Sequence, residues 1–298
     1  MMLFPVRTVS GRDAATAATA AAALALAVAM FGWAGAVRAA DETFVRTVRD
    51  RAGEPVALEV AIARFKHESG ARVDLVGAVH VAEPAYFRAL DARLAGYEAV
   101  LYELVGEPGA TVPPPGASPS IVGLLQGGMK DALGLAFQLE EIDYSRSNFV
   151  HADLTRREFS QSMRERDESL MGLLFRAWVL GMAEQSRRGP AAGQADLLKV
   201  LFAEDRQLAL KRLLAAQLSD QADLLRMISG KDGSTLIEVR NARALEVLER
   251  ELAAGRRRIA IFYGAGHLPD LAERLQREFE LQRTGIEWLE AWDLRSSE

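Results

Sequence analysis

The chain has 298 residues, 49% of them hydrophobic, which is enough apolar sequence to build a buried core. Its formal net charge is −5 and no dense run of Lys and Arg is present, which argues against a nucleic acid as partner. Cysteine is absent, so disulfides, thiolate metal sites and cysteine nucleophiles are excluded. A metal would need nitrogen and oxygen ligands, and the chain has four histidines to offer: His67, His80, His151 and His267.

The first 40 residues predict export. Arg7 and Arg12 precede an apolar run over residues 14–36, and small residues near Ala36 and Ala39 suit cleavage by a signal peptidase. This pattern indicates a secretory signal peptide and a periplasmic or other extracytoplasmic location. An uncleaved anchor that associates with the membrane is the alternative, because the apolar run is long enough to span a bilayer. Residues 41–298 are expected to form a single domain.

The start of this domain predicts two strands, a helix and a third strand. Apolar residues alternate over residues 56–65, and a second short apolar run covers residues 73–79. Pro84 then opens a segment with helical spacing of apolar residues that ends near Gly96. Residues 99–105 return to a strand pattern. Strand, helix and strand in this order are typical of a parallel crossover unit.

The middle of the chain predicts a large helical insertion over about residues 120–230. Prolines and glycines are concentrated in residues 106–119, which indicates an irregular loop before the insertion. Leucines recur at helical spacing over residues 197–225, and residues 170–182 are strongly apolar. No internal repeat of fixed period is present, so the insertion is not expected to be a solenoid.

The end of the chain repeats the pattern of its start. A helix is expected over residues 239–252 and a buried strand over residues 258–263, followed by a helix from Leu268 and a closing strand or strand pair over residues 282–294. The predicted fold class is therefore α/β, with a mixed central sheet made of two related β-α-β halves and a large helical insertion.

Two Gly-x-x-His tetrads share one context. Gly77 to His80 and Gly264 to His267 each follow an apolar strand and precede a helix with proline in its first turn. Ligands in α/β sheets bind beyond the carboxyl ends of strands, so both histidines are placed where sites usually form. Each glycine leaves room for a ligand, a cofactor or another backbone to approach closely.

An acidic residue, Glu103, lies in the apolar run at the same expected edge of the sheet. A buried carboxylate is costly unless it is paired or bound to a cation. Two imidazoles and one carboxylate can bind Mn, Co or Zn, so His80, Glu103 and His267 form a candidate metal site. In the alternative interpretation, Glu103 pairs with an arginine such as Arg240 and each histidine is a hydrogen-bonded turn residue.

Four further polar residues are candidates for supporting roles. Arg240 and Asn241 fall in the helix before the last core strand, where they could orient a carboxylate or a substrate carbonyl, or simply face solvent. His151 and Asp153 could support the ligands or act as further ligands. The favoured interpretation makes them an Asx-type helix start ahead of Thr155.

Taken together, these segments resemble the TraB/PrgY/GumN family, which is related to the Tiki proteins. The resemblance is carried by these blocks: Val76-Gly77-Ala78-Val79-His80 with Tyr86-Phe87, Leu101-Tyr102-Glu103-Leu104, Val239-Arg240-Asn241 and Tyr263-Gly264-Ala265-Gly266-His267-Leu268-Pro269. They cover both ends of the expected domain, and the middle aligns only loosely. One departure is Val239, which stands where relatives often carry an acidic residue; Glu238 is out of register to replace it.

The resemblance implies a function, because Tiki members are metal-dependent proteases that favour Mn or Co. It assigns His80 and His267 as ligands, Glu103 as ligand or general base, and Arg240 and Asn241 as supporting groups. The expected protein is an exported metal-dependent hydrolase that acts on a peptide or protein through metal-bound water. A non-catalytic peptide-binding or pheromone-sequestering protein of TraB type is the alternative, and hydrolysis of a non-peptide ester or amide is a third hypothesis. The sequence indicates no oligomeric state.

Overall fold

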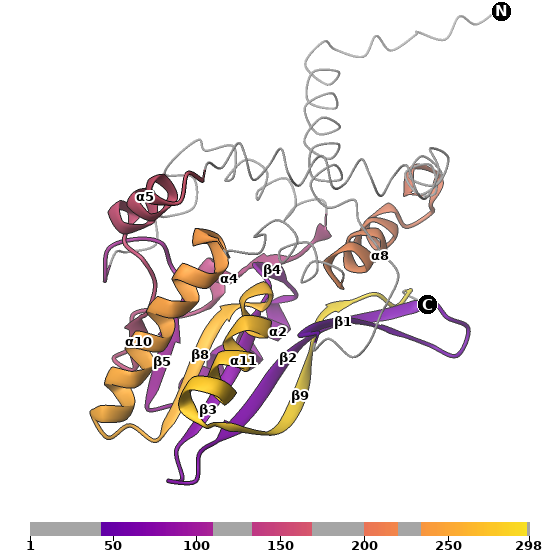
Figure 1. Ribbon diagram of the computed structural model, residues 1–298. Helices are drawn as coiled ribbons and strands as arrows, with labels where there is room; N and C mark the ends of the chain where they lie inside the picture. Colours follow the sequence, from indigo (N-terminus) through magenta and orange to yellow (C-terminus); the bar gives the residue numbers. More distant parts are fainter. Residues whose placement is uncertain (1–42, 110–132, 169–199, 220–233, 297–298) are drawn as a thin grey trace, which may run out of the picture.

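A computed structural model describes residues 43–109, 133–168, 200–219 and 234–296 (Figure 1). The expected leader, the apolar segment 170–182 and most of the loop 106–119 lie outside these residues. Within the described ranges, no helix is both long enough and apolar enough to cross a membrane.

The core of the molecule is a mixed seven-stranded sheet. Strands β3, β8, β5 and β7 lie side by side in this order and run parallel, while β2 pairs antiparallel with β1, β3 and β9. The sheet confirms the predicted α/β class with a mixed central sheet. Its strands are β1 (Val45–Arg49), β2 (Pro55–Lys66), β3 (Arg72–Ala78), β5 (Ala99–Tyr102), β7 (Phe149–His151), β8 (Arg258–Gly264) and β9 (Gln282–Asp293).

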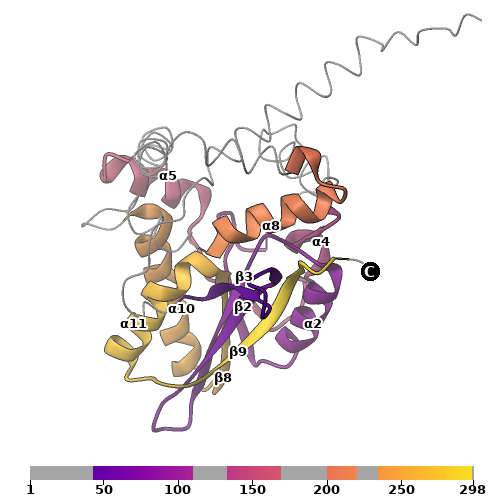
Figure 2. The same cartoon turned by 90° about the vertical axis from the view of Figure 1, so that its right-hand side faces the viewer.

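Helices cover both faces of this sheet (Figure 2). Side chains alternate along a strand, so neighbouring residues of β3 and β8 enter different cores. Val76 and Phe262 pack with helices α2 (Pro84–Leu94) and α8 (Arg206–Ser219). Leu75 and Ile261 pack with α10 (Arg240–Ala253) and α11 (Leu268–Phe279) on the other face. The central strands are thus buried on both sides, which explains why they read as continuous apolar runs.

The strands expected over residues 56–65, 73–79 and 258–263 and the helices expected from Pro84 and Leu268 are confirmed. The closing segment is one long strand, β9. Two boundaries differ from the prediction. β5 ends at Tyr102, so Glu103 follows the strand instead of lying within it, and a π-helical turn, Thr235–Val239, precedes α10. Strand β1 was missed.

The described parts of the middle region contain strands as well as helices. They comprise β6 (Ala136–Phe137), α4 (Gln138–Glu141), β7, α5 (Arg156–Glu165) and α8. β7 forms the parallel edge of the central sheet, and β6 pairs with β4 (Val81–Ala82), directly after His80. The middle region therefore supplies β7 to the central sheet, and its strand β6 pairs with the segment that follows His80.

Candidate active site

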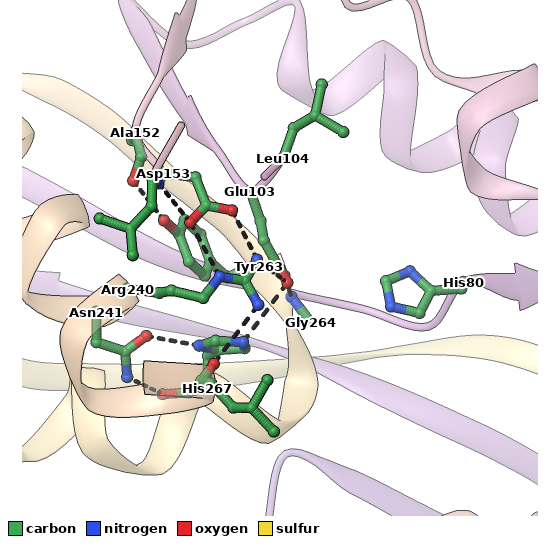
Figure 3. A network of polar contacts seen from close by, with 12 residues as sticks. His80, Glu103, Leu104, Ala152, Asp153, Arg240, Asn241, Tyr263, Gly264 and His267 are labelled. Carbon is green, nitrogen blue, oxygen red and sulfur yellow. Dashed lines mark hydrogen bonds and ion pairs between the residues drawn. The ribbon is translucent and has the colours of Figure 1, made fainter. Parts of the chain in front are cut away.

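Each parallel strand is followed by a polar residue at its carboxyl end. His80 comes two residues after β3, Glu103 directly after β5, Asp153 two residues after β7, and His267 three residues after β8. Because these strands are neighbours and parallel, the four residues lie at one edge of the sheet (Figure 3). This is the edge where α/β proteins place their ligand sites.

Arg240 joins two carboxylates of this edge. Its Nη2 donates to Glu103 Oε1 at 2.6 Å, while Nε and Nη2 donate to Asp153 Oδ1 and Oδ2 at 2.9 and 2.6 Å. The Asp153 side chain is completely buried and that of Arg240 is 11% exposed. Arg240 is therefore the buried counter-ion of both acids, and the interpretation of Arg240 as a solvent-facing helix residue is wrong.

The second oxygen of Glu103 is bound by the first glycine of the second tetrad. The backbone N–H of Gly264 donates to Glu103 Oε2 at 2.6 Å. A Cβ atom at Gly264 would lie 3.2 Å from that oxygen, so a larger residue would crowd the carboxylate. At Gly77, a Cβ atom would lie 2.8 Å from Val60 Cγ1 and 3.0 Å from the carbonyl oxygen of Ala61. The room left by both glycines is thus filled by protein groups.

Asn241 fixes the ring of His267. Its Nδ2 donates to the carbonyl oxygen of His267 at 3.1 Å and to Asp270 Oδ2 at 2.8 Å, so its Oδ1 must face the ring and lies 2.7 Å from Nδ1. An amide oxygen only accepts, so Nδ1 carries a hydrogen. The other ring nitrogen, Nε2, faces Glu103 Oε1 at 3.5 Å. Asn241 is completely buried, contrary to the solvent-facing alternative.

The charges around Glu103 keep it ionised. Burial alone would raise the pKa of this carboxyl, but the neighbouring His267 and Arg240, with a smaller effect of His80, hold it well below its usual range. Burial raises the pKa of the Tyr263 phenol well above its usual range, and Asp153 and Glu103 add to that effect. Tyr263 is therefore a neutral donor, and its hydroxyl donates to the carbonyl oxygen of Ala152.

No family model, curated protein or solved structure matches this chain. The resemblance to the TraB and Tiki proteins stays a prediction from the motifs.

The contacts of Glu103 with Arg240 and His267, together with those of Asp153 and Asn241, form one polar network. His80 lies apart from this network (Figure 3). Its side chain is exposed, and its Nδ1 lies 3.3 Å from Gln138 Oε1. Among the residues that the structure describes, no group of three His, Asp or Glu side chains is close enough to hold a metal ion. The structure therefore brings Glu103, His267, Arg240 and Asn241 together and leaves His80 beside them.

Glu103 and His267 fit as two ligands of one metal ion. Two ligand atoms bound tetrahedrally at about 2.1 Å from a metal lie about 3.4 Å apart. The distance between His267 Nε2 and Glu103 Oε1, 3.5 Å, is close to this value. A carboxylate oxygen has more than one lone pair, so the contact of Glu103 with Arg240 does not exhaust it. A third His, Asp or Glu ligand from the described residues would have to move to reach this pair, because none lies close enough in the structure.

The sequence suggested other roles for Asp153 and His151. The expected Asx-type helix start is wrong, because Thr155 caps α5: its hydroxyl accepts from Glu158 N at 3.2 Å, and Glu158 accepts from Thr155 N at 2.8 Å. Asp153 instead contacts Arg240, which agrees with the less favoured interpretation that it supports the ligands. His151 Nε2 lies 2.7 Å from the carbonyl oxygen of Leu104, a backbone contact beside the network.

Glu238, which precedes Val239, contacts Ser234 and not Arg240. Its carboxylate accepts from the backbone N–H and the hydroxyl of Ser234 at the start of the π-helical turn. Asp153 instead supplies the second acid beside Arg240. This role was hard to find in the sequence, because Asp153 is far from Arg240 along the chain.

Proposed function

We propose that this chain is an exported metal-dependent hydrolase that acts on peptide bonds. The observation that carries the proposal is the pair of His267 and Glu103 at the carboxyl edge of the parallel strands, with Nε2 facing the carboxylate at 3.5 Å. The resemblance to the Tiki metalloproteases supports the reaction class, and the expected leader supports an extracytoplasmic location.

Glu103 and His267 would hold the metal, with His80 as a third ligand. A divalent transition metal such as Mn, Co or Zn would supply Lewis-acid activation of water and of a carbonyl group. Glu103 is ionised, and its lowered pKa favours the role of a metal ligand over that of a general base. Arg240 keeps this carboxylate in place, and Asn241 keeps the ring of His267 facing it. The same groups would serve hydrolysis of a non-peptide ester or amide.

A non-catalytic peptide-binding protein is the second candidate. It is favoured by the hydrogen bonds of Glu103, because each of its two carboxylate oxygens already accepts one, from Arg240 and from Gly264. In that case the network would be a structural ion-pair cluster, and the edge of the sheet would bind a peptide without cleaving it.

The test measures bound metal and peptidase activity of the purified protein supplied with Mn, Co or Zn. His80→Ala and His267→Ala are compared with His67→Ala, because His67 lies in the turn between β2 and β3, away from the network. The proposal expects stoichiometric metal and activity in the wild type and in His67→Ala, and loss of both in the two site variants. A folded wild type that neither binds metal nor cleaves peptides would favour the binding protein.

A further inference from the structure

The backbone of the segment that carries His80 accepts hydrogen bonds from two sides. The carbonyl oxygen of His80 accepts from the backbone N–H of Gln138 at 3.0 Å, next to the pairing of β4 with β6. On the other side, the indole N–H of Trp292 donates to the carbonyl oxygen of Val81 at 2.7 Å. The main chain at His80 is therefore fixed even though the imidazole is exposed.

The side chain of Gln138 reaches the ring of His80. Gln138 is buried, with 7% of its surface exposed. Its Nε2 donates to the hydroxyl of Tyr144 at 2.8 Å, which leaves Oε1 toward His80 Nδ1 at 3.3 Å. The ring of Tyr144 packs edge-on against Tyr102 and Phe149, so the hydroxyl is held by an aromatic cluster.

This arrangement repeats the one around His267. In both places a buried amide side chain faces Nδ1 with its oxygen, from Gln138 to His80 and from Asn241 to His267. An amide oxygen can only accept, so it selects the form of the ring that carries its hydrogen on Nδ1. The ring nitrogen with a free lone pair is then Nε2.

We infer that Gln138, oriented by Tyr144, is a positioning residue that holds His80 in the Nδ1–H form and so prepares Nε2 as a ligand atom. The inference rests on the proposed function, because it gives His80 the same preparation for a metal as His267. Hydrogen-bond partners of ligating histidines fix the tautomer and ring orientation, and their loss typically weakens metal binding about 10- to 100-fold.

Nuclear magnetic resonance of protein labelled with ¹⁵N in histidine tests this inference directly. At about pH 8, where ordinary imidazoles are neutral, two-bond ¹H–¹⁵N correlation spectra distinguish the two tautomers. The chain has four histidines, so each signal can be assigned with single variants. His151 is an internal reference for the opposite form, because its Nε2 lies 2.7 Å from a carbonyl oxygen, that of Leu104, and must carry the hydrogen.

Variants of Gln138 and Tyr144 distinguish a loss of His80 orientation from a general loss of structure. We expect His80 in the Nδ1–H form in the wild type, loss of that form in Gln138→Leu, a partial loss in Tyr144→Phe, and its retention in Gln138→Glu, whose carboxylate also accepts. Gln161→Leu, on the exposed face of α5, is the matched control and should leave His80 unchanged. Zinc alone, added in a calorimetric titration, should bind about 10- to 100-fold more weakly to Gln138→Leu.

Two results would overturn the inference. One is a wild-type His80 with its hydrogen on Nε2, which would mean that the amide of Gln138 faces the other way. The other is an unchanged His80 tautomer in Gln138→Leu and Tyr144→Phe; the second variant decides the question if the first does not fold. A wild type without zinc affinity or activity would contradict the proposed function alone, because the tautomer is read in the metal-free protein.

Discussion

Arg240 sets the charge balance of the site, because one guanidinium serves two carboxylates in a buried position. Asp153 has a completely buried side chain, and its charge is compensated by two hydrogen bonds from Arg240. Burial alone would lower the pKa of Arg240, but the hydrogen bonds of Asp153 and the charge of Glu103 raise it above its ordinary value. Arg240 is therefore a permanent cation on which both acids depend.

Arg240→Leu should strongly destabilise the protein, because it leaves two acids without their counter-ion. Removing one partner of a buried ion pair typically costs about 3–5 kcal/mol of the free energy of unfolding. Arg243→Leu is the matched control on the same helix: the ion pair of Arg243 with Glu158 is partly exposed and should contribute about 0–1 kcal/mol. Urea unfolding measures both. Equal losses in the two variants would contradict the role given to Arg240.

Among the elements, β2, β3 and α11 meet at Gly77 with no space for a side chain. A Cβ atom there would lie 2.8 Å from Val60 Cγ1 and 3.3 Å from Leu268 Cδ2, and the 3.0 Å approach to the carbonyl oxygen of Ala61 involves rigid backbone. Gly77→Ala should therefore cost about 1–3 kcal/mol of the free energy of unfolding. Gly285→Ala in β9, where nothing lies within 4 Å, should be neutral or slightly stabilising. If Gly77→Ala left the free energy of unfolding unchanged, β2 and β3 would be able to move apart at little cost.

The start of α5 predicts a dependence of stability on pH. The pKa of Glu158 is lowered to about 2: the hydrogen bond from the backbone N–H of Thr155 has the largest effect, burial opposes it, and the Thr155 hydroxyl and Arg243 add to the lowering. A lowered pKa means that ionised Glu158 stabilises the fold above the ordinary value of 4.5, and that this stabilisation is lost as the pH falls from 4.5 toward about 2.

The comparison of wild type with Glu158→Gln isolates this effect. The wild type should be more stable at pH 6, by about 1 kcal/mol or less because the side chain is 39% exposed, and the advantage should vanish near pH 2. Urea unfolding at several pH values measures the difference. An advantage that stays constant down to pH 2 would contradict the assignment, because Gln keeps the capping hydrogen bonds but does not ionise.

The sequence predicted the elements that have a regular apolar pattern and missed those that are short. β2, β3, β8 and α11 follow from their periodicity. β7 has three residues and β6 has two, too few to show a pattern, and both depend on pairing with distant strands. At the site, the edge of the sheet was predictable from the two tetrads. The pairing of Glu103 with Arg240 was one of the two interpretations of Glu103, and the structure confirms it. The contacts of Asp153 with Arg240 and of Gln138 with His80 were not predicted, because long-range contacts of polar side chains leave no local signal.

At the scale of the whole molecule, the sheet places the site on its most deeply buried strands. Glu103 follows β5 and His267 follows β8, and β8 lies between β3 and β5 with its residues from Ile259 to Tyr263 at most 1% exposed. Apolar cores on both faces hold these strands. The network around Glu103 is therefore attached to the part of the molecule that is expected to open last.

Hydrogen exchange should show this difference in local stability. Amides buried in a central strand exchange by near-global unfolding, whereas elements with few buried contacts open locally. Met163 is the buried residue of α5, so we expect the amides of β8 to exchange at least about 100-fold more slowly than those of α5. Mass spectrometry of peptides from the two elements measures the rates in one experiment. Similar rates would mean that α5 and the sheet unfold as one cooperative unit, and the site would then have no more rigid support than its surroundings.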